Sequence, residues 1–281
     1  MPNLELTRKK DLSSFRKIAI GTWQTTYDPS VYGTMELRMD EAMRYIADFR
    51  QKTGRRLTVS HLMAKAAAMM LKGCPDANAI MRWNKIYLRK RIGVFFQVVM
   101  ADGDDGATDK VDLSGATLYD VEGKSLKEIC DEFENKVAAV RAKKDPALEK
   151  TRKTFLGIPH FLLNIVLKMI SFFSYTLNLD LRWAGIPQDP FGSIMVTNIG
   201  TLGLDIAYVP LVPYSRVPML LATGAVKDIP VVENGAITVG KMMAVNATFD
   251  HRIIDGFHAA SMSRTLRAWI EHPYDNFDKL D

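Results

Sequence analysis

The stretch Asn246-Ala-Thr-Phe-Asp-His-Arg-Ile-Ile-Asp-Gly256 connects an apolar segment to a helical pattern. Residues 241–249 are expected to form a β-strand, and residues 256–270 a helix that stops before a proline. The short link between them carries four chemically active side chains: Asp250, His251, Arg252 and Asp255. An imidazole at the end of a rigid strand suits proton transfer, because histidine ordinarily titrates near neutral pH. The stretch therefore predicts a strand–turn–helix unit with His251 as a candidate general base.

The composition is that of an ordinary globular protein, with 47% apolar and 25% charged residues among 281. Strand and helix patterns mix without a Pro/Ser-rich linker, so one α/β domain over residues 1–281 is expected. A net charge of +5, with no basic run interleaved with aromatic residues, argues against nucleic-acid binding. Cys74 and Cys130 lack metal-ligand or redox spacing, and the first residues lack an apolar signal region. Together these features predict reduced core thiols in a cytoplasmic protein.

Periodicity and capping residues predict the other elements. Strands are expected at residues 31–39, 80–98, 192–200 and 218–226, with a hairpin over 231–239 signalled by Asn234-Gly235. Helices are expected from an N-cap at Asp40 to Gly54, from about Val59 to Lys72, and from the capping box Ser125–Glu128 toward Lys144. The second of these helices is apolar almost all round, which indicates burial.

Three blocks of the chain resemble, in the right order, the catalytic domain of the dihydrolipoyl acyltransferases of 2-oxo acid dehydrogenase complexes. They are residues 57–80, which end in Cys74-Pro-Asp-Ala-Asn-Ala79, then Val196-Thr-Asn-Ile-Gly200, and residues 218–260 with the His-x-x-x-Asp-Gly motif of His251. Chloramphenicol acetyltransferases share this motif. The resemblance implies a chloramphenicol acetyltransferase-like α/β fold, a mixed-sheet sandwich with flanking helices in a single domain. It also implies a homotrimer, with assembly beyond a trimer left open.

The resemblance further implies a reaction in which His251 and Thr197 come from neighbouring subunits. A neutral His251 takes a proton from the thiol of coenzyme A or of a reduced lipoyl group, and the thiolate attacks the partner thioester. Thr197 stands where the family carries a serine or threonine hydroxyl that donates a hydrogen bond to the tetrahedral oxyanion. The plainer interpretation of Thr197 is a strand residue, since threonine favours strands.

Other residues of the motif are expected to support this site. In the family the aspartate of the motif is a structural anchor that pairs with an arginine and fixes the histidine loop. Asp255 is therefore expected to hold the loop, with Arg16 or Arg8 as its partner. Asn198 and Gly200 are expected to shape the turn after the threonine, and they are the candidate positions for binding coenzyme A.

The remaining histidines and one basic run have plainer interpretations. His258 is expected to pack or to face solvent. His61, His160 and His272 have no carboxylate or cysteine partner at ligand spacing, so no metal site is predicted. The run from Arg82 to Arg91 either meets the phosphates of coenzyme A or forms a solvated strand edge.

Three features depart from the family. Its lipoyl and subunit-binding domains are expected to be absent, which places any lipoyl group on a separate carrier protein or dehydrogenase subunit. The family's Asp-Gly-Leu-Val-Val-Pro-Val stretch, which borders its substrate channel, is replaced by residues 101–112. An apolar helical insertion occupies residues 150–190, with residues 161–177 strongly apolar. It is either a helix packed on the core or on another subunit, a membrane-surface or partner contact through residues 155–178, or a lid for a larger acyl group.

The predicted function is therefore a CoA-dependent acyltransferase that moves an acyl group between coenzyme A and a thiol, such as a dihydrolipoyl group on a separate protein. Two alternatives stay open. One is a non-catalytic scaffold or partner-binding homologue, and the other is acyl transfer from acyl-CoA to a small hydroxyl or amine acceptor.

Overall fold

The computed structural model describes residues 2–10, 29–101, 111–141 and 159–280. Four of the sequence-based predictions fall wholly or partly on other residues. They are Arg16 as a partner of Asp255, the altered segment 101–112, the helix end near Lys144, and residues 150–158 of the insertion. The parts of these predictions that concern residues 11–28, 102–110 and 142–158 lie outside the described residues.

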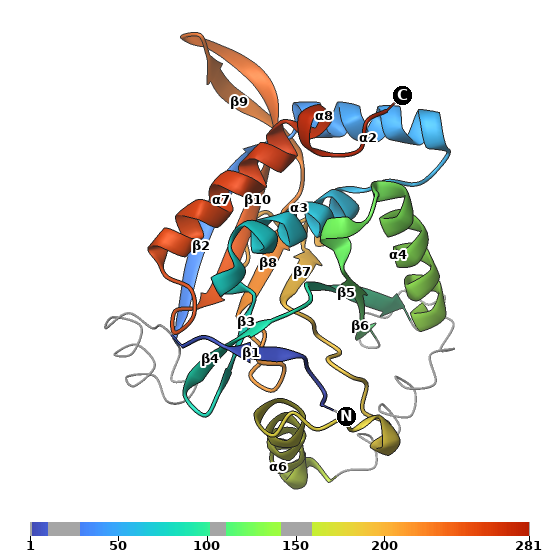
Figure 1. Cartoon of the computed structure of the whole chain (residues 1–281). Helices are drawn as coiled ribbons and strands as arrows, with labels where there is room; N and C mark the ends of the chain where they lie inside the picture. Colours follow the sequence, from blue (N-terminus) through green and yellow to red (C-terminus); the bar gives the residue numbers. More distant parts are fainter. Residues whose placement is uncertain (1, 11–28, 102–110, 142–158, 281) are drawn as a thin grey trace.

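A mixed sheet of seven strands forms the centre of the fold (Figure 1). Its strands are β2 (Ser30–Arg38), β5 (Gly93–Ala101), β6 (Val111–Tyr119), β7 (Ile194–Asn198), β8 (Met219–Thr223), β9 (Lys227–Glu233) and β10 (Ala236–Asp250). Six of them run in the order β2-β10-β8-β7-β5-β6, and β9 pairs with the first part of β10. β7 is parallel to both β5 and β8, and the other pairs are antiparallel. The α/β fold with a mixed sheet is therefore confirmed.

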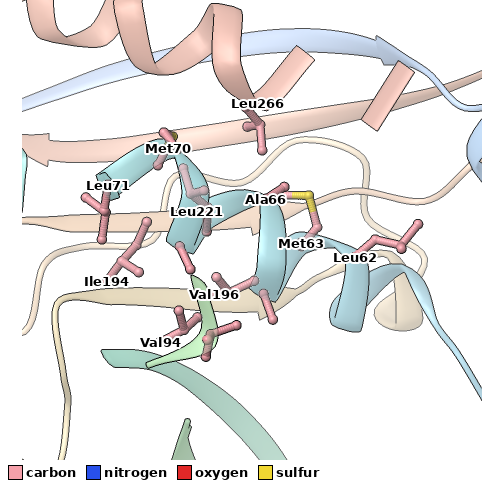
Figure 2. Close-up of a cluster of buried hydrophobic side chains, with 14 of the residues drawn as sticks. Leu62, Met63, Ala66, Met70, Leu71, Val94, Ile194, Val196, Leu221 and Leu266 are labelled. Atoms are coloured by element: carbon pink, nitrogen blue, oxygen red, sulfur yellow. The ribbon is translucent and has the colours of Figure 1, made fainter. Parts of the chain in front are cut away.

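Four helices contribute to the core on one face of this sheet: α2 (Asp40–Thr53), α3 (Val59–Gly73), α4 (Leu126–Arg141) and α7 (Gly256–Glu271). α3 packs on the sheet beside α7, and Figure 2 shows its side chains meeting those of three strands and of α7. The contacting residues include Leu62, Met63, Ala66, Met70, Leu71, Val94, Ile194, Val196, Leu221 and Leu266. α3 is apolar almost all round because it is buried on nearly every side, as its sequence predicts.

The opposite face of the sheet is covered by the chain that surrounds β7 and β8 in sequence. Side chains alternate along a strand, so in β7 and β8 every second residue faces the helices and the residues between them face this opposite side. Met195, Leu220 and Ala222 pack with Phe191 and Val209 in this second cluster. β7 and β8 are thus buried on both faces, which explains their continuous apolar sequences.

A smaller antiparallel sheet carries the basic run from Arg82 to Arg91. Its strands are β1 (Leu6–Arg8), β3 (Ala79–Arg82) and β4 (Lys85–Arg89), in the order β1-β4-β3. β4 is therefore a central strand, and its Arg89 is buried in an ion pair with Asp189 at 2.5 Å between Nη1 and Oδ2. The prediction of a solvated strand edge is wrong, because both edges of β4 are paired.

Local features of the sequence set several element ends. Ser125 and Glu128 form the predicted capping box, in which the Ser125 N–H donates to Glu128 Oε2 at 2.8 Å. Gly54 follows α2 in the left-handed region, at φ 69°. The N-cap of α2 lies one residue earlier than predicted. Met39 occupies it, and the Asp40 carboxylate instead accepts a backbone N–H from β10.

The hairpin that joins β9 to β10 projects from one end of the molecule (Figure 1). Asn234 and Gly235 have φ values of 50° and 81°, as a type I′ turn requires. Short helices and turns complete the main body: η1 (Pro75–Ala77), η3 (Val121–Gly123), η6 (Gly200–Leu202) and α8 (Pro273–Asn276).

The apolar insertion forms a helical arm at the opposite end from this hairpin (Figure 1). α6 (His160–Ser171) continues as a π-helical turn, η4 (Phe172–Thr176), and a 3₁₀ turn follows as η5 (Arg182–Ala184). The helix predicted over residues 161–177 is therefore present, with a wider last turn. Among the helices that the structure describes, none is long and apolar enough to cross a membrane.

Candidate active site

His251 begins the turn between β10 and α7, and the backbone around it is fixed on several sides. Its own N–H donates to the carbonyl of Pro29 at 2.8 Å, just before β2 starts. The preceding residue, Asp250, donates its N–H to the carbonyl of Pro218 at 2.8 Å. The carbonyl of Asp250 accepts the N–H of Ile254 at 2.9 Å. The imidazole therefore extends from a rigid base.

A hydrogen bond within the turn selects one tautomer of the His251 ring. Its Nδ1 lies 2.9 Å from the carbonyl oxygen of Ile254. A carbonyl oxygen can only accept, so Nδ1 carries the proton and the lone pair of the neutral ring lies on Nε2. A positioned neutral imidazole can take a proton from a thiol through that lone pair. The half-buried ring is thus arranged as a general base.

An ion pair between Asp250 and Arg252, the residues on either side of the histidine, stiffens the turn. Asp250 is buried, and its carboxylate accepts from Arg252 Nε at 2.9 Å and from Nη2 at 2.6 Å. It also accepts the backbone N–H of Arg252 at 2.9 Å. A bidentate guanidinium–carboxylate pair is strongly directional. Asp250 and Arg252 therefore bind each other and position His251 between them.

Asp255 caps the start of α7 with its carboxylate. Its Oδ1 accepts the backbone N–H groups of Phe257 and His258, each at 3.1 Å. It also accepts from Nδ1 of the His258 ring at 2.6 Å. His258, which we expected to pack or to face solvent, instead completes this cap. Because the cap directly follows Ile254, it holds the carbonyl that fixes the tautomer of His251, which suits the anchor role predicted for Asp255.

The arginine partner predicted for Asp255 stays a prediction. Arg16 lies outside the described residues, and Arg8 lies in β1 at the edge of the small sheet. Lys9, the residue after Arg8, forms an ion pair with Asp76. Oδ2 of Asp76 lies 3.8 Å from Nε2 of His258. The amino-terminal segment thus reaches the α7 cap from the side of the small sheet.

Thr197 lies near the end of β7, with its hydroxyl directed at a neighbouring strand. The hydroxyl donates to Oε1 of Gln97 at 3.1 Å. Gln97 stands beside Thr197 because β5 and β7 are parallel and Phe96 pairs with Val196. Gln97 is not among the site residues predicted from the sequence. No local feature identifies it, since the contact depends on the register of two strands far apart in the chain.

Asn198 and Gly200 shape the turn that leaves β7, as expected. Oδ1 of Asn198 accepts the N–H of Thr201 at 3.2 Å, and the Thr201 hydroxyl donates to the Asn198 carbonyl at 2.9 Å. A side chain at Gly200 would put its Cβ 2.6 Å from backbone atoms of Gly224 and Ala225. Only glycine fits this close approach of two backbones. Binding of coenzyme A by these two positions stays a prediction.

Thr197 and His251 are far apart within one chain. Thr197 pairs with Ala222 of β8, and Ala222 pairs with Asn246 of β10, so Thr197 is level with Asn246. His251 stands five residues further along. With about 3.3 Å per residue and about 4.8 Å between strands, the two Cα atoms are roughly 19 Å apart. Their side chains cannot span this distance, so one chain does not bring the two groups to a common substrate atom.

Other potentially reactive groups are held in unreactive forms. Burial lowers the pKa of His61 to about 4 and raises the pKa of Cys130 to about 12. Burial also raises the pKa of Cys74, and both cysteines are free, as predicted for core thiols. A thiol that stays protonated at neutral pH is a poor nucleophile. Within the described ranges, no group of three or more His, Cys, Asp or Glu side chains is arranged to hold a metal ion.

A sequence model of the family described as 2-oxoacid dehydrogenases acyltransferase (catalytic domain) matches residues 7–156 and 189–277. The chain belongs to this family. Both Thr197 and His251 lie in the second matched range. Residues 157–188 fall between the two ranges, and they include the helical arm.

Individual acyltransferases match parts of the chain. The lipoamide acyltransferase component of the branched-chain alpha-keto acid dehydrogenase complex of Pseudomonas aeruginosa is 34% identical over 87 residues, which are 31% of this chain and 20% of that protein. The dihydrolipoyllysine-residue acetyltransferase component of the acetoin cleaving system of Bacillus subtilis is 20% identical over 223 residues, 79% of this chain and 44% of that protein. The match thus spans less than half the length of either relative.

Solved acyltransferase structures share the fold. A probable dihydrolipoamide acetyltransferase of Listeria monocytogenes superposes with a TM-score of 0.63 at 18% identity, over 95% of both chains. The dihydrolipoamide acetyltransferase of Azotobacter vinelandii has a TM-score of 0.64 at 18% identity, over 95% of this chain and 93% of that one. A chloramphenicol acetyltransferase has a TM-score of 0.51 at 12% identity, over 95% of this chain and 100% of that one. The fold implied by the sequence motifs is confirmed.

Proposed function

We propose that this protein is a CoA-dependent acyltransferase that moves an acyl group between coenzyme A and a thiol. The thiol we propose is a dihydrolipoyl group carried by a separate protein, because the relatives are lipoamide and dihydrolipoyllysine acyltransferase components. The observation that carries the proposal is the fixed tautomer of His251, whose Nδ1–H donates to the Ile254 carbonyl. It prepares Nε2 to accept a proton from a thiol.

In the proposed reaction, Nε2 of His251 takes the proton from the attacking thiol. The resulting thiolate forms a new C–S bond to the thioester carbonyl, whose oxygen becomes an oxyanion. The Thr197 hydroxyl donates to this oxyanion. Since it has one proton, its hydrogen bond to Gln97 is given up at that moment. When the tetrahedral intermediate collapses, the other C–S bond breaks and His251 returns its proton to the departing thiolate. Atoms and charge balance without a metal.

We further propose that the site forms between two subunits of a homotrimer, with His251 from one and Thr197 from its neighbour. The support for this is the roughly 19 Å between the two residues in one chain, far beyond the reach of catalytic hydrogen bonds of about 3 Å. A solved relative of 19% identity is the cubic core of a pyruvate dehydrogenase multienzyme complex. A larger assembly around a dehydrogenase complex is the corresponding proposal for this protein.

The study of the Azotobacter vinelandii relative concerns a serine, a histidine and an asparagine in its catalytic mechanism. In this chain, we propose that Thr197 and His251 take the places of a hydroxyl and a base. Coenzyme A is proposed to bind beside the turn at Asn198 and Gly200, where the absence of a side chain keeps the two backbones close. Asp255 is proposed to act as a positioning residue, because its carboxylate holds the α7 cap directly after Ile254.

The test is release of coenzyme A from acetyl-CoA in the presence of dihydrolipoamide, with a panel of small hydroxyl and amine acceptors beside it. Turnover with the dithiol is expected in the wild type and is expected to vanish in His251→Ala. His272→Ala is the matched control, because His272 is exposed at the end of α7. Turnover only with a hydroxyl or amine acceptor would replace the thiol proposal. No turnover with any acceptor would favour a scaffold role.

A further inference from the structure

The last turns of the helical arm bury small polar side chains, while large apolar side chains of the arm face outward together with Asn164 and Lys168. Ser171, Ser174 and Thr176 are buried, whereas Ile165 and Met169 are 54% and 51% exposed. A surface helix of a globular protein normally shows the opposite arrangement. The reversal leaves apolar side chains at helical spacing on the outside of the protein.

Hydrogen bonds from the core fix this orientation. Arg216 donates from Nε to the Ser171 hydroxyl at 3.0 Å. Arg82 donates from Nε and Nη2 to the carbonyl of Thr176, at 3.0 and 2.9 Å. The arm cannot rotate its apolar side inward without breaking these bonds and leaving buried polar groups unsatisfied, which is costly.

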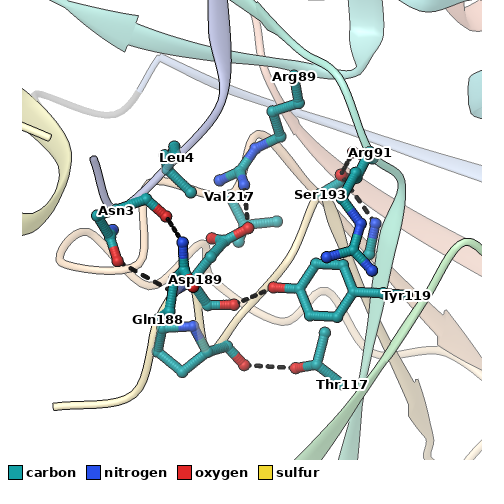
Figure 3. A network of polar contacts seen from close by, with 12 residues as sticks. Asn3, Leu4, Arg89, Arg91, Thr117, Tyr119, Gln188, Asp189, Ser193 and Val217 are labelled. Carbon is teal, nitrogen blue, oxygen red and sulfur yellow. Dashed lines mark hydrogen bonds and ion pairs between the residues drawn. The ribbon is translucent and has the colours of Figure 1, made fainter. Parts of the chain in front are cut away.

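A second set of contacts holds the segment after the arm (Figure 3). The Asp189 carboxylate pairs with buried Arg89, and the Asp189 carbonyl accepts the Tyr119 hydroxyl. Gln188 donates from Nε2 to the carbonyl of Asn3 at 2.8 Å. The described part of the insertion is thus tied to the core at the end of the arm and again at residues 188–189. Its outward apolar side is set by the fold.

The exposed side chains form one continuous surface. We call it the apolar patch, and it consists of Trp83, Ile165, Met169, Phe172, Phe173 and Trp183. Ring centroids are 5.9 Å apart between Trp83 and Phe172, and 5.7 Å apart between Phe172 and Phe173. Met169, Phe173 and Trp183 line a hollow of about 670 Å³, and Ile165 lies one helical turn from Met169. Contiguous apolar surface of this kind marks an interaction site.

The two tryptophans of the patch are its most exposed members. Trp183 is 81% exposed and Trp83 is 60% exposed. Trp83 occupies the turn between β3 and β4 with φ 50°, in the left-handed region that bulky residues rarely adopt. Asn84, the other residue of this two-residue turn, has φ 55°, so the hairpin itself requires the positive φ of Trp83 and holds its side chain at the tip. Indole suits a membrane interface, because its rings are apolar and its N–H is polar.

Exposed cations accompany the patch. Lys85, Lys168 and Arg182 are exposed, and each lies within two residues of a patch side chain. The acid that lines the hollow, Asp180, is already paired with Arg182 at 2.6 Å. The positive charges of the exposed Lys85 and Lys168 are complementary to anionic lipid headgroups. Fluid acyl chains can also fill an irregular hollow, whereas a rigid protein partner needs a matching shape.

We propose that the apolar patch docks this protein onto the surface of a bilayer that contains anionic lipids. The patch side chains enter the interface between headgroups and acyl chains, and the exposed Lys85 and Lys168 contact lipid phosphates. The arm lies on the surface, since α6 has 12 residues and a membrane-spanning helix needs about 20.

Docking brings the catalytic turn near the membrane. Arg216, which bonds to the arm, lies two residues before Pro218. The carbonyl of Pro218 accepts the N–H of Asp250, the residue before His251, at 2.8 Å. The arm and the catalytic turn therefore share one side of the protein. Acyl transfer would take place beside the bilayer surface.

The test is co-sedimentation of the full chain with vesicles of phosphatidylcholine alone and with added phosphatidylglycerol. The wild type is expected to bind the anionic vesicles at low salt. The double variant Ile165→Asp/Met169→Asp is expected to lose binding by more than tenfold. Ile237→Asp is the matched control, because Ile237 is 78% exposed on the hairpin at the opposite end of the molecule. Lys168→Gln is expected to bind about fivefold more weakly at low salt, which is 1 kcal/mol per cation.

Molecular mass by light scattering and circular dichroism accompany the vesicle assay, so that misfolding is recognised. Loss of vesicle binding by the double variant at unchanged mass and helicity supports the proposal. No binding of the wild type to either vesicle, or equal binding of the double variant, overturns it. A change of mass in the double variant without vesicle binding by the wild type assigns the patch to a contact between copies. His251→Ala is expected to bind vesicles like the wild type, so this test does not depend on the proposed function.

Discussion

Mixing two inactive variants tests where the catalytic site is assembled. His251→Ala removes the proposed base. Thr197→Val removes the hydroxyl with little change in shape, and loss of one oxyanion donor costs on the order of 3 kcal/mol, roughly a hundredfold in rate. Each variant alone is therefore expected to be almost inactive. A mixture regains activity only if one subunit supplies the histidine and its neighbour supplies the threonine.

The size of the recovery follows from the register of the sheet. Because Thr197 is level with Asn246 and His251 stands five residues further along β10, no chain joins the two groups by itself. In mixed trimers made from equal amounts, a site works when the first subunit is Thr197→Val and the second is His251→Ala. A trimer that holds both variants, in a 2:1 or a 1:2 ratio, has one such contact among its three, so about one third of the sites in purified mixed trimers regain both groups.

The assay is co-expression of the two variants with different tags, tandem purification of mixed assemblies, and release of coenzyme A per subunit. Separately purified variants combined in the tube without subunit exchange are the control, and they are expected to stay inactive. Native mass spectrometry reports the composition of each sample. Mixed trimers with no more activity than the single variants would refute the argument from register, because the site would then lie within one chain.

Three further outcomes are expected. The pKa of His61 is lowered from 6.5 to about 4 in the folded protein. Between these two pH values the imidazole is therefore protonated in the unfolded state and neutral in the folded state. The free energy of unfolding should therefore fall by about 1.36 kcal/mol per pH unit as pH drops from 6.5 toward 4, or about 3 kcal/mol in total, and His61→Gln should lack this slope in urea titrations. Gly200→Ala should destabilise the fold by about 1–3 kcal/mol in thermal melts, because its Cβ meets backbone atoms at 2.6 Å, whereas Gly33→Ala has open space and should change little. Asp255→Ala should lose about 1 kcal/mol of helix capping, and kcat should fall more than the melting temperature suggests, because the Ile254 carbonyl that orients His251 moves. Ser125→Ala, which removes the cap of another helix, is the control. If Ser125→Ala lowers both the melting temperature and kcat as much as Asp255→Ala does, this last expectation is contradicted.

Much of the local structure was predictable from short patterns. The hairpin at Asn234-Gly235, the capping box at Ser125 and the end of α2 at Gly54 each depend on residues within a few positions, so the sequence contains the whole cause. The strand, turn and helix around His251 belong to the same class. The Asp40 N-cap was misplaced because the Asp40 carboxylate bonds to β10, a contact about 200 residues away in sequence.

Contacts between distant segments were out of reach. Gln97 beside Thr197 depends on the parallel register of β5 and β7. His258 is different, because its contact is local: it was expected to pack or to face solvent, yet it donates to Asp255, three residues earlier on the same turn. The basic run from Arg82 to Arg91 was expected either to meet the phosphates of coenzyme A or to form a solvated strand edge. The edge alternative is wrong, because the pairing of β1 makes β4 a central strand.

The sequence by itself determined which side chains the His251 turn carries, the family of the chain and most of its helices and strands, because these depend on residue type and short-range periodicity. It also located an apolar helix in the insertion. Only the tertiary structure decided which groups meet. It puts Thr197 and His251 roughly 19 Å apart, since two strand spacings and five residues of β10 separate them. It also turns the apolar side of the arm outward, because Arg82 and Arg216 bind its polar side from the core.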